Sequence, residues 1–189
     1  CAVGGINVVG LNPDSQQGDK VILDILKRCG GKFKPVEGGL HFDRSLLKAT
    51  EIDLADCPDL GPILFTLGCF CSGETVIRNA GRLRLKESDR IEAMQTELRK
   101  MGARIEVDGD TVHIQGVALH APNAPLSGHN DHRIVMALAV AAIASGLPAL
   151  LCGAEAVDKS WPAFWSVLRG LGAKVELNTD KQEEFDIKA

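Results

Sequence analysis

Aromatic residues are scarce in this sequence, and it has no long uninterrupted apolar run. It contains no tyrosine, six phenylalanines and two tryptophans among 189 residues, and its formal net charge is −4. Nucleic-acid binding depends on basic surfaces and on aromatic side chains against which bases stack. The most apolar stretch, residues 134–151, is interrupted by Ser145, Gly146 and Pro148, which makes it unsuited to span a bilayer. The sequence therefore predicts a protein with no nucleic-acid partner and no membrane partner.

The first five residues, CAVGG, lack both the basic segment and the long apolar segment of a secretory signal. We therefore expect a cytoplasmic protein, and the lack of an initial methionine suggests a processed chain or a piece of a longer one. The cysteines form no Cys-x-x-Cys pair, and most stand among apolar residues. This pattern favours reduced core thiols over a disulfide framework or a zinc site. The six are Cys1, Cys29, Cys57, Cys69, Cys71 and Cys152.

Three segments of the sequence resemble one another. Each has apolar residues at helical spacing, a basic residue near the end, a glycine stop and then a short alternating stretch typical of a strand. The segments are 22–36, 94–107 and 164–177. Gly31, Ala103 and Ala173 hold matching places in them, so a helix–strand pair is predicted to recur with a period of roughly 70 residues.

A second repeat runs in phase with the first. Residues 60–71 and 132–145 are apolar over a broad face, and each stretch follows an aspartate, Asp59 or Asp131. Because residues 134–144 are apolar nearly all round, we expect that helix to be deeply buried. A short strand pattern follows each of the two stretches. Hairpin turns are predicted at 37–39 and 108–110.

These patterns predict an α/β (α+β) fold made of repeated βαββαβ units, with helices packed inside a ring of sheets. Two copies of the unit account for most of the chain, and a third helix and strand are left over at the C-terminus. The hydrophobic share of 45% and the charged share of 24% are those of a globular domain. We expect one domain over residues 1–177, followed by a polar tail over 178–189 that is polar enough to be disordered.

Residues 82–90, with the sequence RLRLKESDR, carry the densest group of charges. Leucines alternate with cations here, which predicts an extended segment that presents Arg82, Arg84 and Lys86 on one face. Ser88 is a good N-cap for a helix that is expected to run to residue 101.

Arg90 falls in the first turn of that predicted helix. A cation in this place opposes the helix macrodipole, so Arg90 is poorly placed for helix stability alone. It would suit a phosphate or carboxylate bound at the helix start. Pairing with Glu87 or Asp89 explains it equally well, and both interpretations remain open.

Residues 129–133, with the sequence HNDHR, repeat this arrangement at the start of the next apolar helix. Arg133 falls in the first turn, and Asp131 is expected to be a plain N-cap. His129 and His132 flank Asp131 and resemble metal ligands in type. Because no second carboxylate or histidine cluster supports that interpretation, we expect no metal.

Two further residues stand at comparable junctions. Asp59 follows Pro58 before an apolar helix, as a capping residue would, but a carboxylate near several cations would also stay ionised and accept a proton. The residue pattern does not choose between these two roles. Lys159 stands just before Ser160 and Pro162, which predict a helix start with Ser160 as its cap. A lone lysine is usually solvated, and Lys159 draws interest because other cations hold similar places.

Three motifs, LRLKESDRIEAM, HNDHRIVMALAVAA and DKSWPAF, occur in this order on the repeat just described. Together they resemble the EPSP synthase (3-phosphoshikimate 1-carboxyvinyltransferase) family, in its C-terminal domain, and the resemblance is clear over residues 57–177. It implies a two-domain enolpyruvyl transferase fold, of which this chain is one domain. The implied reaction transfers the enolpyruvyl group of phosphoenolpyruvate to the 5-hydroxyl of shikimate 3-phosphate and releases phosphate, by addition and then elimination. The resemblance implies a shikimate-pathway enzyme of aromatic amino-acid biosynthesis that uses no metal and no cofactor.

The resemblance also implies binding roles, position by position. Asp59 resembles the carboxylate that contacts the shikimate 5-hydroxyl and accepts its proton, and Lys86 resembles the lysine that binds shikimate 3-phosphate at that hydroxyl. Arg90 and Arg133 resemble the two arginines that hold phosphoenolpyruvate. Lys159 resembles the lysine on the phosphate of phosphoenolpyruvate.

Glu87 matches the glutamate that is implicated in proton transfer at the enolpyruvyl methylene, and His132 lies beside it in the family's site. The implied catalytic residues are Asp59, Glu87 and Lys159. Asp131 aligns as a structural neighbour, so its capping role stands. Arg82 departs from the family, which more often has asparagine or an acidic residue there, and it is given no role.

Several parts of the family's site have no counterpart in this sequence. They are a Lys-Ser pair, a glycine-containing loop, a further arginine and several serines that bind the shikimate phosphate. We therefore expect this chain to supply half of the active site, to need the N-terminal half of the enzyme as a partner, and to be inactive alone. Two alternatives remain. A UDP-amino-sugar enolpyruvyl transferase would lack the KESDR and DHR motifs, and a non-catalytic binding or scaffold module would use the repeat alone.

Overall fold

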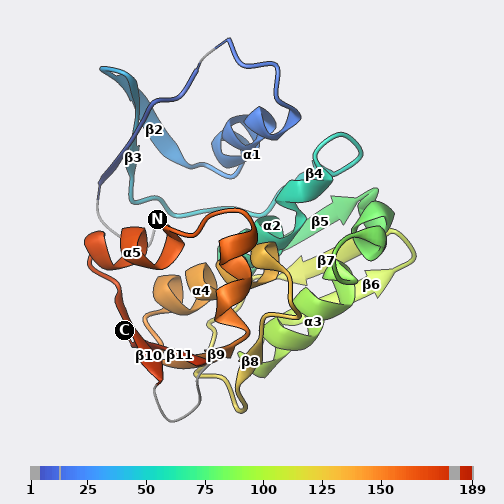
Figure 1. The fold of residues 1–189 in the computed structure, drawn as a ribbon. Coiled ribbons are helices and arrows are strands. Elements are labelled where there is room, and N and C mark those ends of the chain that lie inside the picture. Colours follow the sequence, from blue (N-terminus) through green and yellow to red (C-terminus); the bar gives the residue numbers. More distant parts are fainter. Residues whose placement is uncertain (1–4, 13, 179–183, 189) are drawn as a thin grey trace.

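The computed structural model describes residues 5–12, 14–178 and 184–188, and Figure 1 shows helices gathered among three β-sheets. Each sheet is built from one consecutive stretch of the sequence. Each stretch is one copy of a repeated unit, so the predicted α/β fold class is confirmed.

The second unit shows the full arrangement. Its sheet has the strand order β4-β5-β7-β6, in which β4 and β5 run parallel and the other neighbours run antiparallel. The hairpin predicted at 108–110 joins β6 to β7. The elements are β4 (Glu51–Asp53), the 3-10 helix η2 (Pro58–Leu60), α2 (Gly61–Phe70), β5 (Glu74–Arg78), the 3-10 helix η3 (Ala80–Leu85), α3 (Arg90–Lys100), β6 (Arg104–Asp108) and β7 (Thr111–Gln115).

The third unit repeats this topology. Its strand order is β8-β9-β11-β10, again with a parallel first pair and antiparallel neighbours after it. The repeat read from the sequence therefore corresponds to a repeat of the fold. The elements are β8 (Leu126–Ser127), α4 (His132–Ser145), β9 (Ala149–Cys152), the 3-10 helix η4 (Ala154–Lys159), α5 (Phe164–Gly170), β10 (Lys174–Asn178) and β11 (Glu184–Lys188).

The first unit has only the later part of this topology among the described residues. Its three strands take the order β1-β3-β2 and are all antiparallel, like the last three strands of the other sheets. The hairpin predicted at 37–39 joins β2 to β3. The elements are β1 (Ile6–Val9), the 3-10 helix η1 (Gly18–Val21), α1 (Ile22–Arg28), β2 (Lys32–Val36) and β3 (Gly39–Asp43). The sequence analysis placed the partial unit at the C-terminus, and this was wrong because β11 completes the third unit.

Strand β11 lies inside the segment that was predicted to be a disordered polar tail. Residues 179–183 and 189 of that tail lie outside the described residues, but Glu184–Lys188 pairs with β10 on one side and with β9 on the other. Ile187 is only 1% exposed. The charged residues that surround two apolar ones in this segment hid the alternation of a strand, and pairing on both edges stabilises it.

Helices α2 and α4 form the centre of the molecule and are buried along most of their length, as predicted for α4. The Thr66 hydroxyl donates a hydrogen bond to the carbonyl of Ala137, at 3.0 Å, and so ties α2 to α4. Gly68 lets α2 approach the neighbouring sheet, because a Cβ there would lie 3.1 Å from Cγ2 of Ile114. Among the described residues, no helix is both long and apolar enough to cross a membrane.

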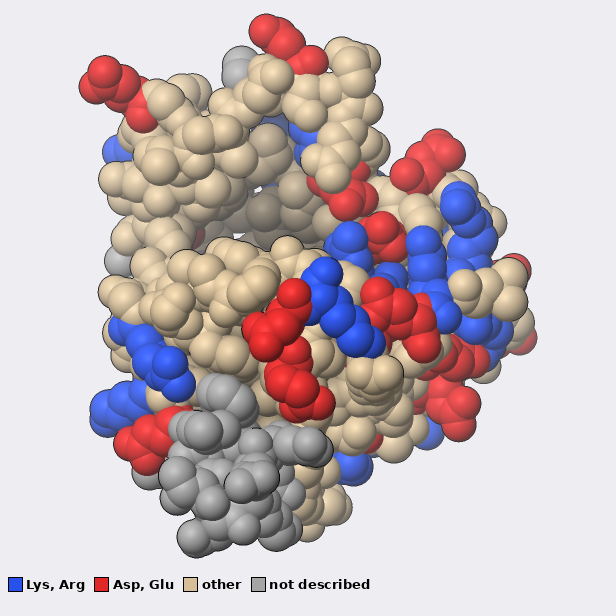
Figure 2. Space-filling view, viewed as in Figure 1, with Lys and Arg blue, Asp and Glu red and all other residues tan. Residues whose placement is uncertain are grey.

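The sheet of the first unit stands away from the other two, and Figure 2 shows a hollow between them. Within the first unit, a cavity of about 770 Å³ is lined by residues of η1, α1 and the β2–β3 hairpin, with Leu11 beside them. Val9 and Leu11 are exposed at 67% and 42%. The first unit therefore leaves apolar surface uncovered.

Replacing Ile187 by alanine tests whether β11 is part of the third sheet. Because the side chain is buried, Ile187→Ala should lower the free energy of unfolding by about 2–4 kcal/mol. Urea unfolding followed by circular dichroism measures this. Leu46→Ala is the matched control, because Leu46 is 96% exposed and its truncation should change stability by less than about 0.5 kcal/mol. Equal, small effects of both substitutions would show that residues 184–188 are a tail.

Candidate active site

Charged side chains from the second and third units meet where α2, α3 and α4 begin. Asp59 lies in η2, Arg90 opens α3, and Arg133 lies in the first turn of α4. Figure 2 shows Lys and Arg side chains gathered, with Asp and Glu between them, on the side where β4, β5 and the start of α3 lie. The six residues given roles by sequence, Asp59, Lys86, Glu87, Arg90, Arg133 and Lys159, all have their side chains in this cluster.

Asp59 is the point at which three of the cations meet. Its carboxylate lies 3.0 Å from Lys86 Nζ, 3.1 Å from Arg90 Nη1 and 3.2 Å from Arg133 Nη2. Arg133 also donates through Nη1 to the Asp59 carbonyl, at 3.0 Å. Asp59 makes no capping hydrogen bond at η2 or α2. The structure therefore favours the second of the two roles left open, a carboxylate held among cations.

Lys86 reaches Asp59 from the end of η3. The sequence analysis predicted an extended segment here, but residues 80–85 form a 3-10 helix, so Arg82 and Arg84 do not share a face with Lys86. Arg82 donates to the carbonyl of Ala55, and Arg84 pairs with Asp89. The 3-10 helix directs Arg82 and Arg84 away from Lys86, and of these three cations only Lys86 contacts Asp59.

Arg90 is buried, with only 2% of its surface exposed, and it is paired with Asp131 from the next unit. Its Nε and Nη2 donate to the two oxygens of Asp131, at 2.8 Å and 3.2 Å. The sequence analysis considered Glu87 or Asp89 as partners, and both are wrong. This two-bond pair joins the start of α3 to the start of α4, and charge-assisted pairs of this form are the strongest that proteins make.

The caps of these helices differ in part from those predicted. Asp89, not Ser88, caps α3, by accepting from the backbone amides of Ile91 and Glu92. The Ser88 hydroxyl instead donates to Asp131, at 3.1 Å. Asp131 caps α4 as predicted, by accepting from the amide of Arg133.

The predicted helix start at Ser160 is also displaced. Residues 154–159 form η4, and α5 begins only at Phe164, with Ala163 at its N-cap position. Lys159 is therefore the last residue of a 3-10 helix. Its Nζ donates to the backbone carbonyl and to Oδ1 of Asn130, the latter at 2.8 Å.

Glu87 and His132 form the second part of the cluster. The Glu87 carboxylate lies 3.1 Å from Nδ1 of His132 and 3.7 Å from Nζ of Lys159. Glu87 is partly exposed and His132 is nearly buried. A carboxylate with a neighbouring imidazole and ammonium group can give up or accept a proton at an exposed edge.

Two carboxyl groups in the cluster are held ionised. Burial raises the pKa of Asp59, but the hydrogen bond from Lys86 and the charges of Arg133, Lys86 and Arg90 outweigh it, so this pKa lies below its ordinary value. Burial likewise opposes ionisation of Asp131. The hydrogen bonds and charge of Arg90, with the Arg133 amide and the Ser88 hydroxyl, hold the pKa of Asp131 below its ordinary value.

One group of side chains has the donor types of a metal site. Glu87, Asp131 and His132 each offer an atom within 4.8 Å of the others. Both oxygens of Asp131 already accept from Arg90, and Lys159 stands beside Glu87. A divalent cation here would have to displace these positive charges, so the donor set does not fit a metal.

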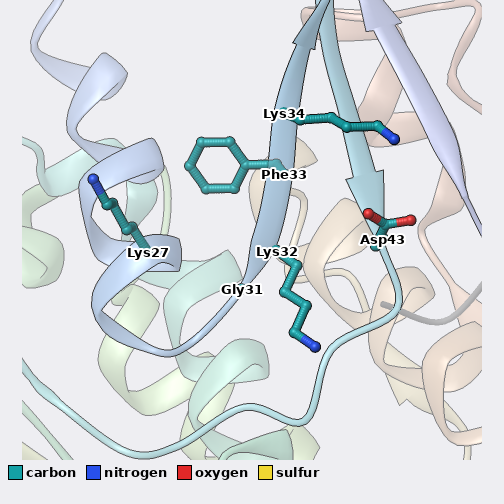
Figure 3. A pocket seen from close by; sticks show the side chains of 6 residues that line it. All are labelled: Lys27, Gly31, Lys32, Phe33, Lys34 and Asp43. Carbon is teal, nitrogen blue, oxygen red and sulfur yellow. The ribbon is translucent and has the colours of Figure 1, made fainter.

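A surface pocket of about 350 Å³ beside β2 also carries lysines. Figure 3 shows Lys27, Lys32 and Lys34 pointing in different directions around Phe33 and Asp43. Their ammonium groups do not converge on one point, as the cations around Asp59 do. This pocket therefore offers no comparable anion site.

Three residues of the cluster make contacts that the sequence did not predict. Asp131 was expected only to cap α4, and it also pairs with Arg90. Ser88 was expected only to cap α3, and it contacts Asp131 instead. Asn130 received no role, and it binds Lys159. The motifs KESDR and HNDHR contain all three residues, so their position within the motifs was the available signal.

Replacing Asp131 by asparagine tests how much the buried pair with Arg90 contributes. At pH 7, Asp131→Asn should lower the free energy of unfolding by about 3–5 kcal/mol, because the buried Arg90 loses its two-bond partner and keeps only the partly exposed Asp59 as counter-charge. The pKa of Asp131 is depressed in the folded state, so its contribution is full above about pH 4 and is lost as the pH falls through the folded pKa. The stability gap between wild type and variant should therefore narrow below about pH 4.

Denaturant unfolding at a series of pH values measures this gap. Glu92→Gln, on the exposed face of the same helical turn, is the matched control and should change stability by less than about 0.5 kcal/mol. A gap that stays constant from pH 7 to pH 3 would contradict the assigned role of the pair.

Comparisons with known proteins provide independent evidence of family membership. A model of the family described as EPSP synthase (3-phosphoshikimate 1-carboxyvinyltransferase) matches residues 2–168. The 3-phosphoshikimate 1-carboxyvinyltransferase of Clostridium acetobutylicum is 45% identical over 172 residues, which are 91% of this chain and 40% of that protein. That of Methanocaldococcus jannaschii is 39% identical over 173 residues, again 91% of this chain and 40% of the relative.

A solved structure of EPSP synthase from Acinetobacter baumannii matches with a TM-score of 0.72 and 27% identity, over 88% of this chain and 41% of the other. The chain thus spans about 40% of the length of the curated relatives it matches. The family model covers most of the chain, and the fold agrees with it, so the chain belongs to the EPSP synthase family.

Proposed function

We propose that this chain forms one side of an enolpyruvyl transferase site. The proposed reaction transfers the enolpyruvyl group of phosphoenolpyruvate to the 5-hydroxyl of shikimate 3-phosphate and releases phosphate. Family membership supports this proposal, since the matched relatives are named 3-phosphoshikimate 1-carboxyvinyltransferase. Cys29, Cys57, Cys69 and Cys71 are buried thiols, which supports the expected reducing, cytoplasmic location.

The observation that carries the proposal is the contact of one carboxylate, Asp59, with three cations at once. Both proposed substrates carry several negative charges. Fixed Arg and Lys groups would offset those charges and the repulsion between the two substrates. A carboxylate at the centre of the same cations would be available as the proton acceptor for a hydroxyl bound between the two substrates.

The proposed binding roles are those that the family resemblance implies, and the contacts that bring these residues into one cluster support them. Arg90, Arg133 and Lys159 bind phosphoenolpyruvate, with Lys159 on its phosphate. Lys86 and Asp59 face the 5-hydroxyl of shikimate 3-phosphate. Burial of Arg90 and its bonds to Asp131 fix the guanidinium before any ligand arrives, which lowers the cost of ordering the site.

The proposed chemistry has two steps. In the addition, the 5-hydroxyl oxygen bonds to C2 of phosphoenolpyruvate, its proton passes to Asp59, and the methylene carbon gains a proton from Glu87. In the elimination, Glu87 takes a proton back from the new methyl group, the bond between C2 and the phosphate oxygen breaks, and phosphate leaves with the proton that Asp59 had accepted. His132 and Lys159 are in contact with Glu87 and would stabilise it as its charge changes.

Substrate binding would also change the basicity of Asp59. Its pKa is depressed by Lys86, Arg90 and Arg133, so it is a weak base in the free chain. When the anionic groups of the substrates engage these cations, their attraction for the Asp59 carboxylate weakens. Its pKa should then rise toward the ordinary value, and the carboxylate becomes a better proton acceptor once both substrates are present.

The rest of the cleft is proposed to come from the part of the relatives that this chain does not match. The chain corresponds to about 40% of their length, and the cluster is exposed along the edge that includes Asp59, Glu87 and Lys159. We therefore expect an incomplete site, in which water reaches the reacting groups and the isolated chain has no turnover.

A titration of the isolated, isotope-labelled chain with each substrate tests the half-site. Phosphoenolpyruvate should shift the NMR signals of Arg90, Arg133 and Lys159, and shikimate 3-phosphate those of Asp59 and Lys86. Inorganic phosphate measured after mixing the chain with both substrates should stay at the background level. An absence of shifts at millimolar ligand would favour a scaffold, and multiple turnover by the chain alone would contradict the need for a second half.

Loss of Lys159 should weaken transition-state stabilisation in the completed enzyme. After addition of the missing segment of a relative, Lys159→Met should lower kcat/KM for phosphoenolpyruvate by about 30-fold to 1000-fold, corresponding to about 2–4 kcal/mol. A coupled phosphate-release assay measures this. Lys32→Met, which removes an exposed lysine outside the cluster, is the matched control and should leave kcat/KM unchanged. Equal rates for the two variants would remove Lys159 from the site.

A further inference from the structure

We propose that Glu97 is a positioning residue that holds the loop before α4 and, through this loop, sets the place of the Lys159 ammonium group. This inference rests on the proposed function, because Lys159 is there assigned to the phosphate of phosphoenolpyruvate. Glu97 itself does not contact the cluster around Asp59, and it lies in the last two turns of α3.

The burial of Glu97 is not a requirement of the fold. Only 1% of its surface is exposed, and ionised carboxylates are rarely buried so far unless they are bound on several sides. In the repeat, the matching positions in the other two helices hold Ile25 and Val167. In the first unit, Ile25 is 1% exposed, so an apolar side chain fills the matching buried position there, while Val167 in the third unit is 38% exposed. The buried carboxylate of the second unit therefore needs another reason.

The bonds of Glu97 supply that reason, because two of the three go to the end of β8 and to the loop that follows it. One carboxylate oxygen accepts from the Ser127 amide at 2.8 Å and from Lys100 Nζ at 2.7 Å. The other lies 3.0 Å from Nε2 of His129. The loop is thus held through Ser127, the last residue of β8, and through the side chain of His129 within the loop.

The loop that Glu97 holds has a backbone conformation that is unfavourable by itself. His129 and Asn130 have φ values of 49° and 53°, in the left-handed region that non-glycine residues seldom occupy. Two such residues in succession persist only where their surroundings impose the conformation. The bonds of Glu97 to Ser127 and His129 are part of those surroundings.

This conformation is what presents Asn130 to Lys159. Both the backbone carbonyl and the side-chain oxygen of Asn130 accept from Lys159 Nζ. If the loop relaxed to ordinary φ values, the carbonyl would turn and Lys159 would lose this pair of acceptors. Its remaining neighbour would be Glu87, 3.7 Å away, and the ammonium group would no longer stand where the loop now holds it.

Two variants test the inference in the full chain. Glu97→Gln keeps the shape but removes the charge and one acceptor, and Glu97→Ile introduces the residue that the first unit has at this position. In both, the loop should relax, so Lys159 should be acetylated about fivefold faster by trace acetic anhydride, and phosphoenolpyruvate should bind about tenfold more weakly. Peptide mass spectrometry measures acetylation, with Lys32 as the internal reference, and NMR titration measures binding.

Thr66→Val is the matched control for a general loss of stability. Thr66 is also buried, at 2% exposure, and its single hydrogen bond joins α2 to α4 without touching the loop. This variant should lower the melting temperature and leave the acetylation of Lys159 unchanged. If Glu97→Ile folds stably and still protects Lys159 as the wild type does, the inference is overturned.

The two proposals can fail separately. Acetylation of Lys159 is measured without any substrate, so a faster reaction in the Glu97 variants supports the positioning role whether or not the wild type binds phosphoenolpyruvate. An absence of phosphoenolpyruvate binding by the wild type would count against the proposed function alone. Unchanged acetylation together with normal wild-type binding would count against the role of Glu97 alone.

Discussion

The buried pair of Arg90 and Asp131 is the interaction on which the cluster depends. It joins the first residue of α3 to the cap of α4, so it fixes two helix starts from different units against each other. Each partner also serves a neighbour, since Arg90 contacts Asp59 and Asp131 binds the amide of Arg133. Without this pair, Arg90 and Arg133 would no longer be held together beside Asp59.

The repeat explains why the cluster lies where it does. Helices α2 and α4 begin after equivalent strands, and Asp59 and Asp131 precede them at equivalent places. The two aspartates have nevertheless taken different roles. Asp131 is fully buried and caps its helix, while Asp59 makes no cap and faces the cations at the surface. A repeated fold has thus provided two carboxylates, of which one orders the site and the other is available for chemistry.

Much of the fold could be predicted from the sequence because its signals are local. The helical period, the glycine stops and the hairpin turns gave the units, and Arg90 and Arg133 stood out as cations in first helical turns. The partner of Arg90 could not be predicted, since it lies 41 residues away and only the packing of α3 on α4 brings it near. Strand β11 was missed for a similar reason, because its stability comes from two neighbouring strands and not from its own composition.

In the free chain, the Asp59 carboxylate competes with incoming anions for the cations that surround it. This carboxylate already neutralises the cations that an incoming anion would use, and because it is tethered, its effective concentration at those cations is high. Anion binding is then an exchange, and the measured affinity is the difference between two attractions. A simple ion such as inorganic phosphate gains little from the exchange. A ligand that offers the displaced carboxylate a hydroxyl to bind gains more, so the side chain that we propose as the proton acceptor would also select which anions are retained.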